Sequence, residues 1–283
     1  MDLSMTESQF RQEICDKLEN DYNEFKYYQE VVLDTLNAFH QVCVKNDISY
    51  CLAYGSLLGA VRDGGQIPWD YDVDLWVWHD DIPRLLEALD SDLPKKYYYV
   101  CRYKDMKHRH FMMRLAPNEF DSEVLHVDVF WLFGAPTDAD KLRRMVVLYN
   151  RRRALGRYKY LPNAVLEYNQ PRPQRFFLRL KKFVVSLLPS TCIDYFHYKA
   201  LRKANPQSDY CCDEFGILMK KEWLAQKCLM TFSNGMHFYV PAGYKEMLNS
   251  LYGDWQSYLS ISDRMSEFQT SLQRIRKLGK REK

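Results

Sequence analysis

The chain has 283 residues, of which 47% are hydrophobic and 15% aromatic, and its 40 basic residues nearly balance its 37 acidic ones. This composition excludes a disordered chain, a collagen-like repeat and a low-complexity linker protein, because so many apolar side chains can build a core. The length suffices for one large domain or two small ones. A net charge of +3 argues against a dedicated nucleic-acid binder, whose surface is usually strongly basic. We therefore expect no specific nucleic-acid partner.

The sequence carries no signal for export or membrane insertion. Residues 1–21 are polar and acidic, whereas a signal peptide has a basic start and an apolar centre. Uninterrupted apolar stretches such as 183–185 and 187–188 are far shorter than the roughly 20 residues of a membrane-spanning helix. The eight cysteines form no CxxC pair and no zinc-finger spacing, which is typical of reduced, buried thiols. We expect a cytoplasmic protein, soluble or peripheral at the inner membrane face.

Apolar residues recur at helical spacing through residues 6–46, which predicts two amphipathic helices there. The elements expected after them are, in chain order, a strand at 49–54, a helix at 57–62 beginning just after Gly55-Ser56, a strand at 70–77, a helix around 85–89 capped by Asp80 or Asp81, and strands at 97–101, 110–115 and 126–133. This succession predicts an α+β fold, with mixed α/β content, a mixed sheet, N-terminal helices and a helical C-terminal part.

Charge is distributed unevenly along the chain. Residues 141–182 contain 13 basic residues and one acidic residue, Glu167, and residues 274–283 contain six basic residues and one acidic residue. We therefore divide the chain into residues 1–140, the N-terminal helices with the catalytic core, and residues 141–283, a basic, mainly helical region that completes the same catalytic unit. The basic block at 141–182 is either a solvated surface, a contact for an anionic membrane or lipid-linked glycan, or a site for single-stranded nucleic acid.

The chemistry is concentrated in one acidic run. Asp70, Asp72 and Asp74, here called the acidic triplet, alternate with apolar residues, and a strand would place them on one face about 6.5 to 7 Å apart. Three like charges in a row repel one another unless a cation neutralises them. Mg²⁺, or Mn²⁺ in its place, prefers such carboxylates together with phosphate oxygens. The alternative is a solvated acidic edge strand.

Two further features support a phosphate and metal site. Gly55 and Ser56 lie between a strand and a helix, where backbone N–H groups and a hydroxyl can hold a phosphate. Asp128 shares a strand face with His126 and Phe130, and a charge in an apolar strand is costly unless it meets a cation. A phosphate grip, paired carboxylates and a third Asp on a neighbouring strand are the arrangement of polymerase-beta-like nucleotidyltransferases, which use metal ions for in-line phosphoryl displacement.

The segment 55–75, GSLLGAVRDGGQIPWDYDVDL, resembles the signature motif of the LicD family. The segment 126–132, HVDVFWL, is similar to the second family motif, and 238–255 is similar to the C-terminal motif, in which we assign no mechanism to Tyr252 and Asp254. The resemblance implies a nucleotidyltransferase-type fold that transfers a phospho-alcohol from a CDP-activated donor to a glycan hydroxyl and releases CMP. The wording WDYDVDL is closest to the animal ribitol-phosphate branch, whose zinc site has no matching cysteine spacing here.

Carried over by position, the resemblance implies that Asp72 and Asp74 bind Mg²⁺, that Asp128 is a third ligand or the base toward the acceptor hydroxyl, and that Asp70 supports the site. The predicted reaction moves phosphocholine from CDP-choline to a sugar of a cell-surface glycan, such as teichoic acid or lipopolysaccharide, or of its lipid-linked precursor. Transfer of ribitol or glycerol phosphate, transfer of NMP to a small molecule, and a degenerate binding module remain as alternatives.

Other side chains are candidates for donor binding besides Gly55 and Ser56. Arg62 and Arg114 are candidate clamps for the donor phosphates, although Arg62 also fits a solvated helix end. His126 is a candidate partner of Asp128 and is nearly as consistent with a structural histidine. Trp69 and Tyr71 flank the acidic triplet and could stack on cytidine or hold a quaternary ammonium, but packing explains them equally well.

Overall fold

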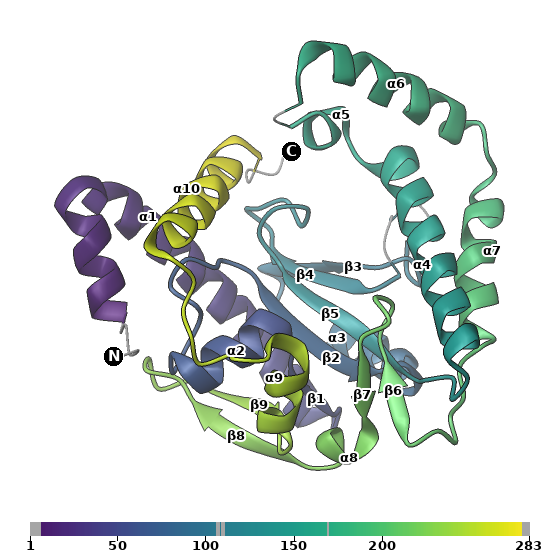
Figure 1. The fold of residues 1–283 in the computed structure, drawn as a ribbon, viewed down its shortest axis with the longest axis horizontal. Helices are drawn as coiled ribbons and strands as arrows, with labels where there is room; N and C mark the ends of the chain where they lie inside the picture. Colours follow the sequence, from purple (N-terminus) through teal and green to yellow (C-terminus); the bar gives the residue numbers. More distant parts are fainter. Residues whose placement is uncertain (1–6, 106–107, 109–110, 169, 279–283) are drawn as a thin grey trace. The chain divides into compact units, whose positions relative to one another are not determined.

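The computed structural model describes residues 7–105, 108, 111–168 and 170–278 (Figure 1). The chain divides into two compact units. The first unit comprises Met1–Tyr99, Arg114–Val129 and Glu222–Lys283, and the second comprises Val100–Met113 and Phe130–Lys221. Both units are discontinuous in sequence, and the boundary at residue 140, which marks a change in charge, lies inside the second unit.

A mixed set of strands and helices builds the first unit, which confirms the predicted α+β class. The strands β1 to β5 span Tyr50–Leu52, Val73–Trp78, Tyr97–Val100, Met113–Pro117 and Val127–Gly134. They follow the order β1-β2-β5-β4-β3, and β1 pairs antiparallel with β2 so that Leu52 lies opposite Leu75. The strand β5 continues beyond Val129 into the second unit. The buried strands β2 and β5 therefore place Asp74 and Asp128 in the centre of the sheet order.

The N-terminal region is one helix, α1 (Glu7–Lys45), so the prediction of two helices is wrong. No Gly or Pro interrupts this stretch, and a polar run alone does not end a helix. Phe25, Val32, Leu36 and Phe39 are fully buried along one side of α1. The predicted start at residue 6 lies outside the described residues.

The structure corrects two predicted element boundaries near the acidic triplet. The helix α2 (Tyr54–Arg62) begins three residues earlier than expected, so Gly55 and Ser56 lie in its first turn. The strand β2 begins at Val73, so Asp70 and Asp72 precede it and the three carboxylates do not line one strand face. The reason is a turn after Ile67, where the Asp70 amide donates a hydrogen bond to the Ile67 carbonyl at 2.9 Å.

The remaining elements of the first unit surround this sheet. The helix α3 (Ile82–Asp92) follows a single 3₁₀ turn, η1 (His79–Asp81), and Asp81 occupies the cap position without a side-chain hydrogen bond, contrary to the predicted cap. The predicted strands at 97–101 and 126–133 are confirmed as β3 and β5. The strand predicted at 110–115 corresponds to β4, which begins at Met113; residue 110 lies outside the described residues. The C-terminal elements are α8 (Lys221–Leu224), which begins at the last residue of the second unit, the hairpin β8 (Lys227–Thr231) and β9 (His237–Pro241), and the helices α9 (Tyr244–Tyr252) and α10 (Ile261–Leu278).

The second unit is mainly helical. Its elements are α4 (Ala139–Tyr160), α5 (Asn163–Leu166), α6 (Arg172–Ser186), α7 (Ser190–Leu201), β6 (Tyr210–Cys212) and β7 (Leu218–Lys220). An ion pair between Arg102 and Asp194 at 2.5 Å is buried in it, and the ring of His197 stacks on Phe111 with centroids 3.4 Å apart. None of the described helices has the length and apolar character needed to cross a bilayer.

Candidate functional site

The loop that carries the acidic triplet is fixed against α2 and α1. A Cβ atom on Gly59 would come within 2.6 Å of the Gly65 carbonyl oxygen and 2.8 Å of the Ile67 amide nitrogen, so only glycine permits this approach. From α1, the buried Gln29 side chain donates hydrogen bonds to the carbonyls of Ile67, at 3.0 Å, and Asp70, at 2.5 Å. The backbone on both sides of Pro68 is therefore held from two helices.

The start of α2 faces the acidic triplet directly. A Cβ atom on Gly55 would lie 3.1 Å from Oδ2 of Asp70, so the carboxylate rests against the helix backbone. Ser56 Oγ accepts a hydrogen bond from the Asp74 amide at 2.8 Å, and the Ala53 amide donates to the Asp74 carbonyl at 2.8 Å. Because a hydroxyl that accepts one bond retains its own proton for donation, Ser56 can also donate to a ligand.

The acidic triplet is electrostatically unfavourable in its surroundings. Burial, followed by the charge of Asp72 and a hydrogen bond with it, raises the pKa of Asp70 well above its usual range. Burial, followed by the charges of Asp72, Asp128 and Asp70, raises the pKa of Asp74 in the same way. These carboxylates therefore lie close enough to repel one another, and Asp128 acts on the same group from the neighbouring strand.

Asp128 has its charge compensated by neighbouring side chains. Arg114 Nε donates to Asp128 Oδ1 at 2.8 Å, and His126 Nε2 lies 3.3 Å from the same oxygen. Burial raises the pKa of Asp128, but the charges of Arg114 and His126 outweigh it and hold that pKa well below its usual range. Arg114 also pairs with Glu123 Oε2 at 2.9 Å and donates to the Ser122 carbonyl at 3.3 Å. The arginine thus pairs with two carboxylates at once.

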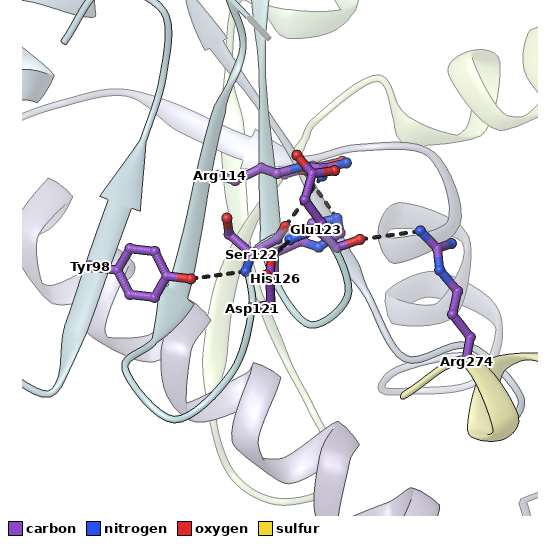
Figure 2. A network of polar contacts seen from close by, with 8 residues as sticks. Tyr98, Arg114, Asp121, Ser122, Glu123, His126 and Arg274 are labelled. Carbon is purple, nitrogen blue, oxygen red and sulfur yellow. Dashed lines mark hydrogen bonds and ion pairs between the residues drawn. The ribbon is translucent and has the colours of Figure 1, made fainter. Parts of the chain in front are cut away.

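Figure 2 shows how this network is supported from other elements. The Ser122 amide donates to Tyr98 Oη at 2.9 Å, and Tyr98 in turn donates to the Phe120 carbonyl at 2.9 Å. From α10, Arg274 Nη2 donates to the Glu123 carbonyl at 3.2 Å. The loop between β4 and β5 is therefore fixed by β3 on one side and by the C-terminal helix on the other.

Three of the predicted donor-binding residues lie in a different environment. Arg62 forms a two-pronged ion pair with Asp63, with Nη2 at 2.9 Å from Oδ2, and its guanidinium lies 4.2 Å from the Tyr258 ring centroid. Trp69 is buried with its ring 6.1 Å from that of Tyr258, and Tyr71 is also buried. These contacts favour packing as the role of Trp69 and Tyr71, and a phosphate bound by Arg62 would have to compete with Asp63.

Sequence reasoning left two residues of the site without a role. Tyr252, at the end of α9, has its pKa raised to about 12 by burial and then by the charges of Asp74 and Asp70, which places it near the acidic triplet. The helix α9 contacts α2, which explains this approach (Figure 1). Glu123, the second carboxylate on Arg114, lies in a loop without any pattern. Only the C-terminal motif at 238–255 gave a signal for Tyr252.

The charge of the acidic triplet suits a divalent cation, although its carboxylates are not gathered into a complete ligand set. Within the part of the chain that the structure describes, no group of three or more His, Cys, Asp or Glu side chains is gathered as a metal-binding set. Burial and, after it, the charge of Asp72 raise the pKa of both Asp70 and Asp74, and a bound cation would favour their ionised forms. Asp128 differs, because Arg114 and His126 already supply its counter-charge.

Most of the residues that form this site lie in a segment that matches a known protein family. The sequence model of the LicD/FKTN/FKRP nucleotidyltransferase domain matches residues 47–159, a range that contains Ser56, the acidic triplet, Arg114 and Asp128. Residues 47–159 are thus similar to a LicD-family domain. The resemblance suggested by the motifs is therefore confirmed, and the mixed sheet with its helices agrees with a nucleotidyltransferase-like LicD domain.

Individual LicD relatives extend the comparison. The lipopolysaccharide cholinephosphotransferase LicD of Haemophilus influenzae is 25% identical over 243 residues, which cover 80% of this chain and 89% of that protein. An uncharacterized protein of Rickettsia typhi is 48% identical over 99 residues, or 29% of this chain and 32% of that protein. The human ribitol 5-phosphate transferase FKRP is 57% identical over 35 residues, covering 12% of this chain and 7% of that protein. Both characterised relatives carry names that describe transfer of a substituted phosphate.

Proposed function

We propose that this protein is an enzyme that transfers phosphocholine from CDP-choline to a sugar hydroxyl of a cell-surface glycan or its lipid-linked precursor, with release of CMP. The observation that carries the proposal is the acidic triplet beside Gly55 and Ser56, within the residues that match the LicD-family domain. Burial and repulsion between carboxylates disfavour the ionised forms of Asp70 and Asp74 there. The match of 80% of the chain to a cholinephosphotransferase supports phosphocholine as the group transferred. A cytoplasmic location belongs to the same proposal.

Asp72 and Asp74, with Asp70 beside them, are the residues that would hold Mg²⁺ or Mn²⁺. The bound cation would supply positive charge to the phosphate oxygens during an in-line displacement. The carboxylates themselves would exclude an anionic donor unless this charge were neutralised, so we expect donor binding to require the divalent ion.

The chain's own groups account for the remaining tasks. The Gly55 and Ser56 amides in the first turn of α2, with the Ser56 hydroxyl, would bind a donor phosphate, because a helix start presents N–H groups to an anion. Asp128 is held ionised by Arg114 and His126, and a carboxylate with so low a pKa is a poor proton acceptor. Of the two roles predicted for Asp128, this argues against the base toward the acceptor hydroxyl, while the role of third metal ligand stays a prediction.

A second candidate donor is a CDP-polyol. The 35 residues shared with a ribitol 5-phosphate transferase at 57% identity are the observation that favours it. Transfer of ribitol or glycerol phosphate would use the same acidic triplet and the same leaving group, so only the alcohol of the donor would differ. Transfer of NMP to a small molecule is the remaining alternative for this type of fold.

A donor panel tests the proposal. The purified chain would be heated with CDP-choline, CDP-ribitol, CDP-glycerol, a UDP-sugar or ATP, each with and without Mg²⁺, and CMP release would be measured in parallel. We expect a rise in Tm with CDP-choline that requires Mg²⁺, together with CMP formation when an acceptor is present. Stabilisation by CDP-ribitol alone would select the polyol branch. Stabilisation by ATP or the UDP-sugar, and by none of the CDP compounds, would overturn the proposal.

A further inference from the structure

The helix α6 (Arg172–Ser186) of the second unit presents an unusual surface. None of its residues is buried, and large apolar side chains are exposed along it, among them Phe176 at 66% and Phe183 at 63%. The same surface continues past its end to Leu187, which is 70% exposed. Scattered apolar residues on a surface are normal, but a contiguous run of large ones marks a contact site.

The exposed apolar side chains form one stripe along the helix. Phe176, Leu180, Phe183 and Leu187 follow one another at intervals of three or four residues, so they lie on the same face. The opposite side carries Leu178, Lys182 and Val185, which are half-buried, and α6 contacts α4. Only this opposite side is used for packing within the unit.

Hydrogen bonds fix α6 against α4 in this orientation. Lys182 Nζ, near the end of α6, donates to the Leu161 carbonyl at 2.5 Å. Lys159 Nζ, near the end of α4, donates to the carbonyls of Ser186, at 3.1 Å, and Leu188, at 2.5 Å. The apolar stripe is therefore held outward by the fold of the unit.

Basic residues border the apolar stripe. The helix carries Arg172, Arg175, Arg179, Lys181 and Lys182 and no acidic residue. Helical spacing places Arg172 and Arg179 on one side of the stripe and Lys181 on the other. The one acidic residue of the block 141–182, Glu167, is paired with Arg179 at 2.7 Å. The stripe thus has basic residues on both sides, and of these Arg179 is compensated by Glu167.

The apolar stripe and its basic borders together indicate what kind of partner binds α6. A second copy of the chain would bring an equally basic helix against α6, and the like charges would repel. An amphipathic helix with aromatic and aliphatic residues on one face and Lys and Arg at its borders is suited to the interface of an anionic bilayer, where the long basic side chains reach the headgroups. We propose that α6 binds the surface of membranes that contain anionic lipids, with Phe176, Leu180, Phe183 and Leu187 in the acyl-chain boundary.

Within the basic block at 141–182, basic residues of α4 such as Arg143, Arg151 and Arg157 are also exposed, but α6 joins its basic residues to the apolar stripe. Arg152 is buried, with Nη2 3.6 Å from Asp194 Oδ1, and the Arg153 guanidinium lies 4.0 Å from the Phe215 ring centroid. Arg152 is therefore not available to a membrane surface, and Arg153 is only half-exposed. The membrane contact uses α6 instead, and it does not depend on which donor the enzyme uses.

Vesicle flotation of the full chain tests the proposal. The probes are vesicles of phosphatidylcholine alone and of phosphatidylcholine with phosphatidylglycerol. We expect binding to the anionic vesicles only. The double variant Phe176→Gln/Phe183→Gln should bind at least about tenfold more weakly, because each ring contributes apolar area to the bilayer interface. The double variant Arg172→Glu/Lys181→Glu should abolish the preference for anionic lipid.

A matched control uses exposed apolar residues of the first unit. Leu229→Gln/Leu259→Gln replaces side chains that are also more than half exposed, and it should bind vesicles like the unaltered chain. CMP release with a soluble acceptor should stay unchanged in the α6 variants, which separates this proposal from the proposed function. Equal binding of the control and the Phe176/Phe183 variant, or no vesicle binding by the unaltered chain, would overturn the proposal. A dimer in sedimentation that the Phe176/Phe183 variant abolishes would assign the stripe to a second copy instead.

Discussion

The hydroxyl of Ser56 accepts a hydrogen bond from the backbone amide of Asp74 at 2.8 Å. This single contact joins the first turn of α2 to the second residue of β2, and it fixes the position of the Asp74 carboxylate relative to the helix start. A side chain predicted only as a phosphate contact thus also positions the acidic triplet.

Replacing Ser56 with alanine should therefore weaken both stability and activity. The variant Ser56→Ala leaves the Asp74 amide without its acceptor, and an unsatisfied buried donor costs about 1–3 kcal/mol. Urea unfolding should show this loss, and CMP release should fall. The control Ser91→Ala removes an exposed hydroxyl that bonds the Glu87 carbonyl, and it should leave both measurements nearly unchanged. Full activity in Ser56→Ala would contradict the positioning role.

The variant Asp74→Asn should separate stability from function. Removing one charge relieves the repulsion within the acidic triplet, so we expect a higher Tm than the unaltered chain in EDTA. The stabilisation by Mg²⁺ and CDP-choline and the release of CMP should both be lost. Asp80→Asn, at a fully exposed carboxylate, provides the matched control. A Tm in EDTA that falls, with the Mg²⁺ response retained, would remove Asp74 from the metal site.

Breaking the Arg114 network should be costly because its partners are buried. The variant Arg114→Met leaves Asp128 and Glu123 without their cation, and loss of one member of a buried ion pair typically costs about 3–5 kcal/mol. The double variant Arg114→Met/Asp128→Asn should recover part of this loss in urea unfolding. By contrast, Arg84→Met, at an exposed ion pair with Asp81, should change stability little. Additive losses in the double variant would show that the pair is not coupled.

The stability of the protein should depend on pH through Asp213, which lies in the second unit. Burial raises the pKa of this fully buried carboxyl to about 7, although the amides of Phe215, Ile217 and Gly216 lower it in part. The folded protein then binds a proton that the unfolded chain has released between about pH 4 and pH 7, so the contribution of Asp213 to stability falls across that window and is constant above it.

The variant Asp213→Asn should remove this contribution. Relative to the unaltered chain, its free energy of unfolding should rise from pH 5 to pH 8 by on the order of 3 kcal/mol, because pH 5 already lies above the unfolded pKa. Urea unfolding at the two pH values measures the difference. The control is Asp209→Asn, at an exposed carboxyl. Its free energy of unfolding should differ from that of the unaltered chain by the same amount at both pH values. A difference between variant and unaltered chain that does not change with pH would contradict the assignment.

The sequence patterns predicted some parts of the site and not others for definable reasons. The charge of Arg114 within an apolar strand predicted a clamp for the donor phosphates, whereas in the structure its guanidinium pairs with Asp128 and Glu123. Its partner Glu123 could not be predicted, since a loop residue has no periodicity. Alternation over 70–77 predicted one strand, but the turn after Ile67 keeps Asp70 and Asp72 outside β2. Alternation alone does not distinguish a strand from a fixed loop.

Trp69 and Arg62 illustrate a second limit. Trp69 is a donor-binding candidate because it flanks the acidic triplet, and Arg62 because it ends the helix that begins near Gly55-Ser56. The structure adds that both contact Tyr258, almost 200 positions further along the chain. Long-range packing of this kind leaves no signal in a local pattern. The family motifs, in contrast, correctly identified the segment that lies around Asp74, because a motif records the whole loop and not single side chains.

The two hydrogen bonds of Gln29 have a practical consequence for protein production. Its amide, on α1, holds the carbonyls of Ile67 and Asp70, yet residue 29 lies outside the 47–159 stretch that defines the family domain. The same stretch also omits α10, from which Arg274 holds the Glu123 carbonyl. A polypeptide trimmed to residues 47–159 would keep the acidic triplet, Glu123 and Asp128. It would lose the hydrogen bonds from Gln29 and Arg274 that hold the two loops near these carboxylates. Boundaries drawn from family similarity thus mark shared ancestry, whereas a working fragment needs both flanking helices.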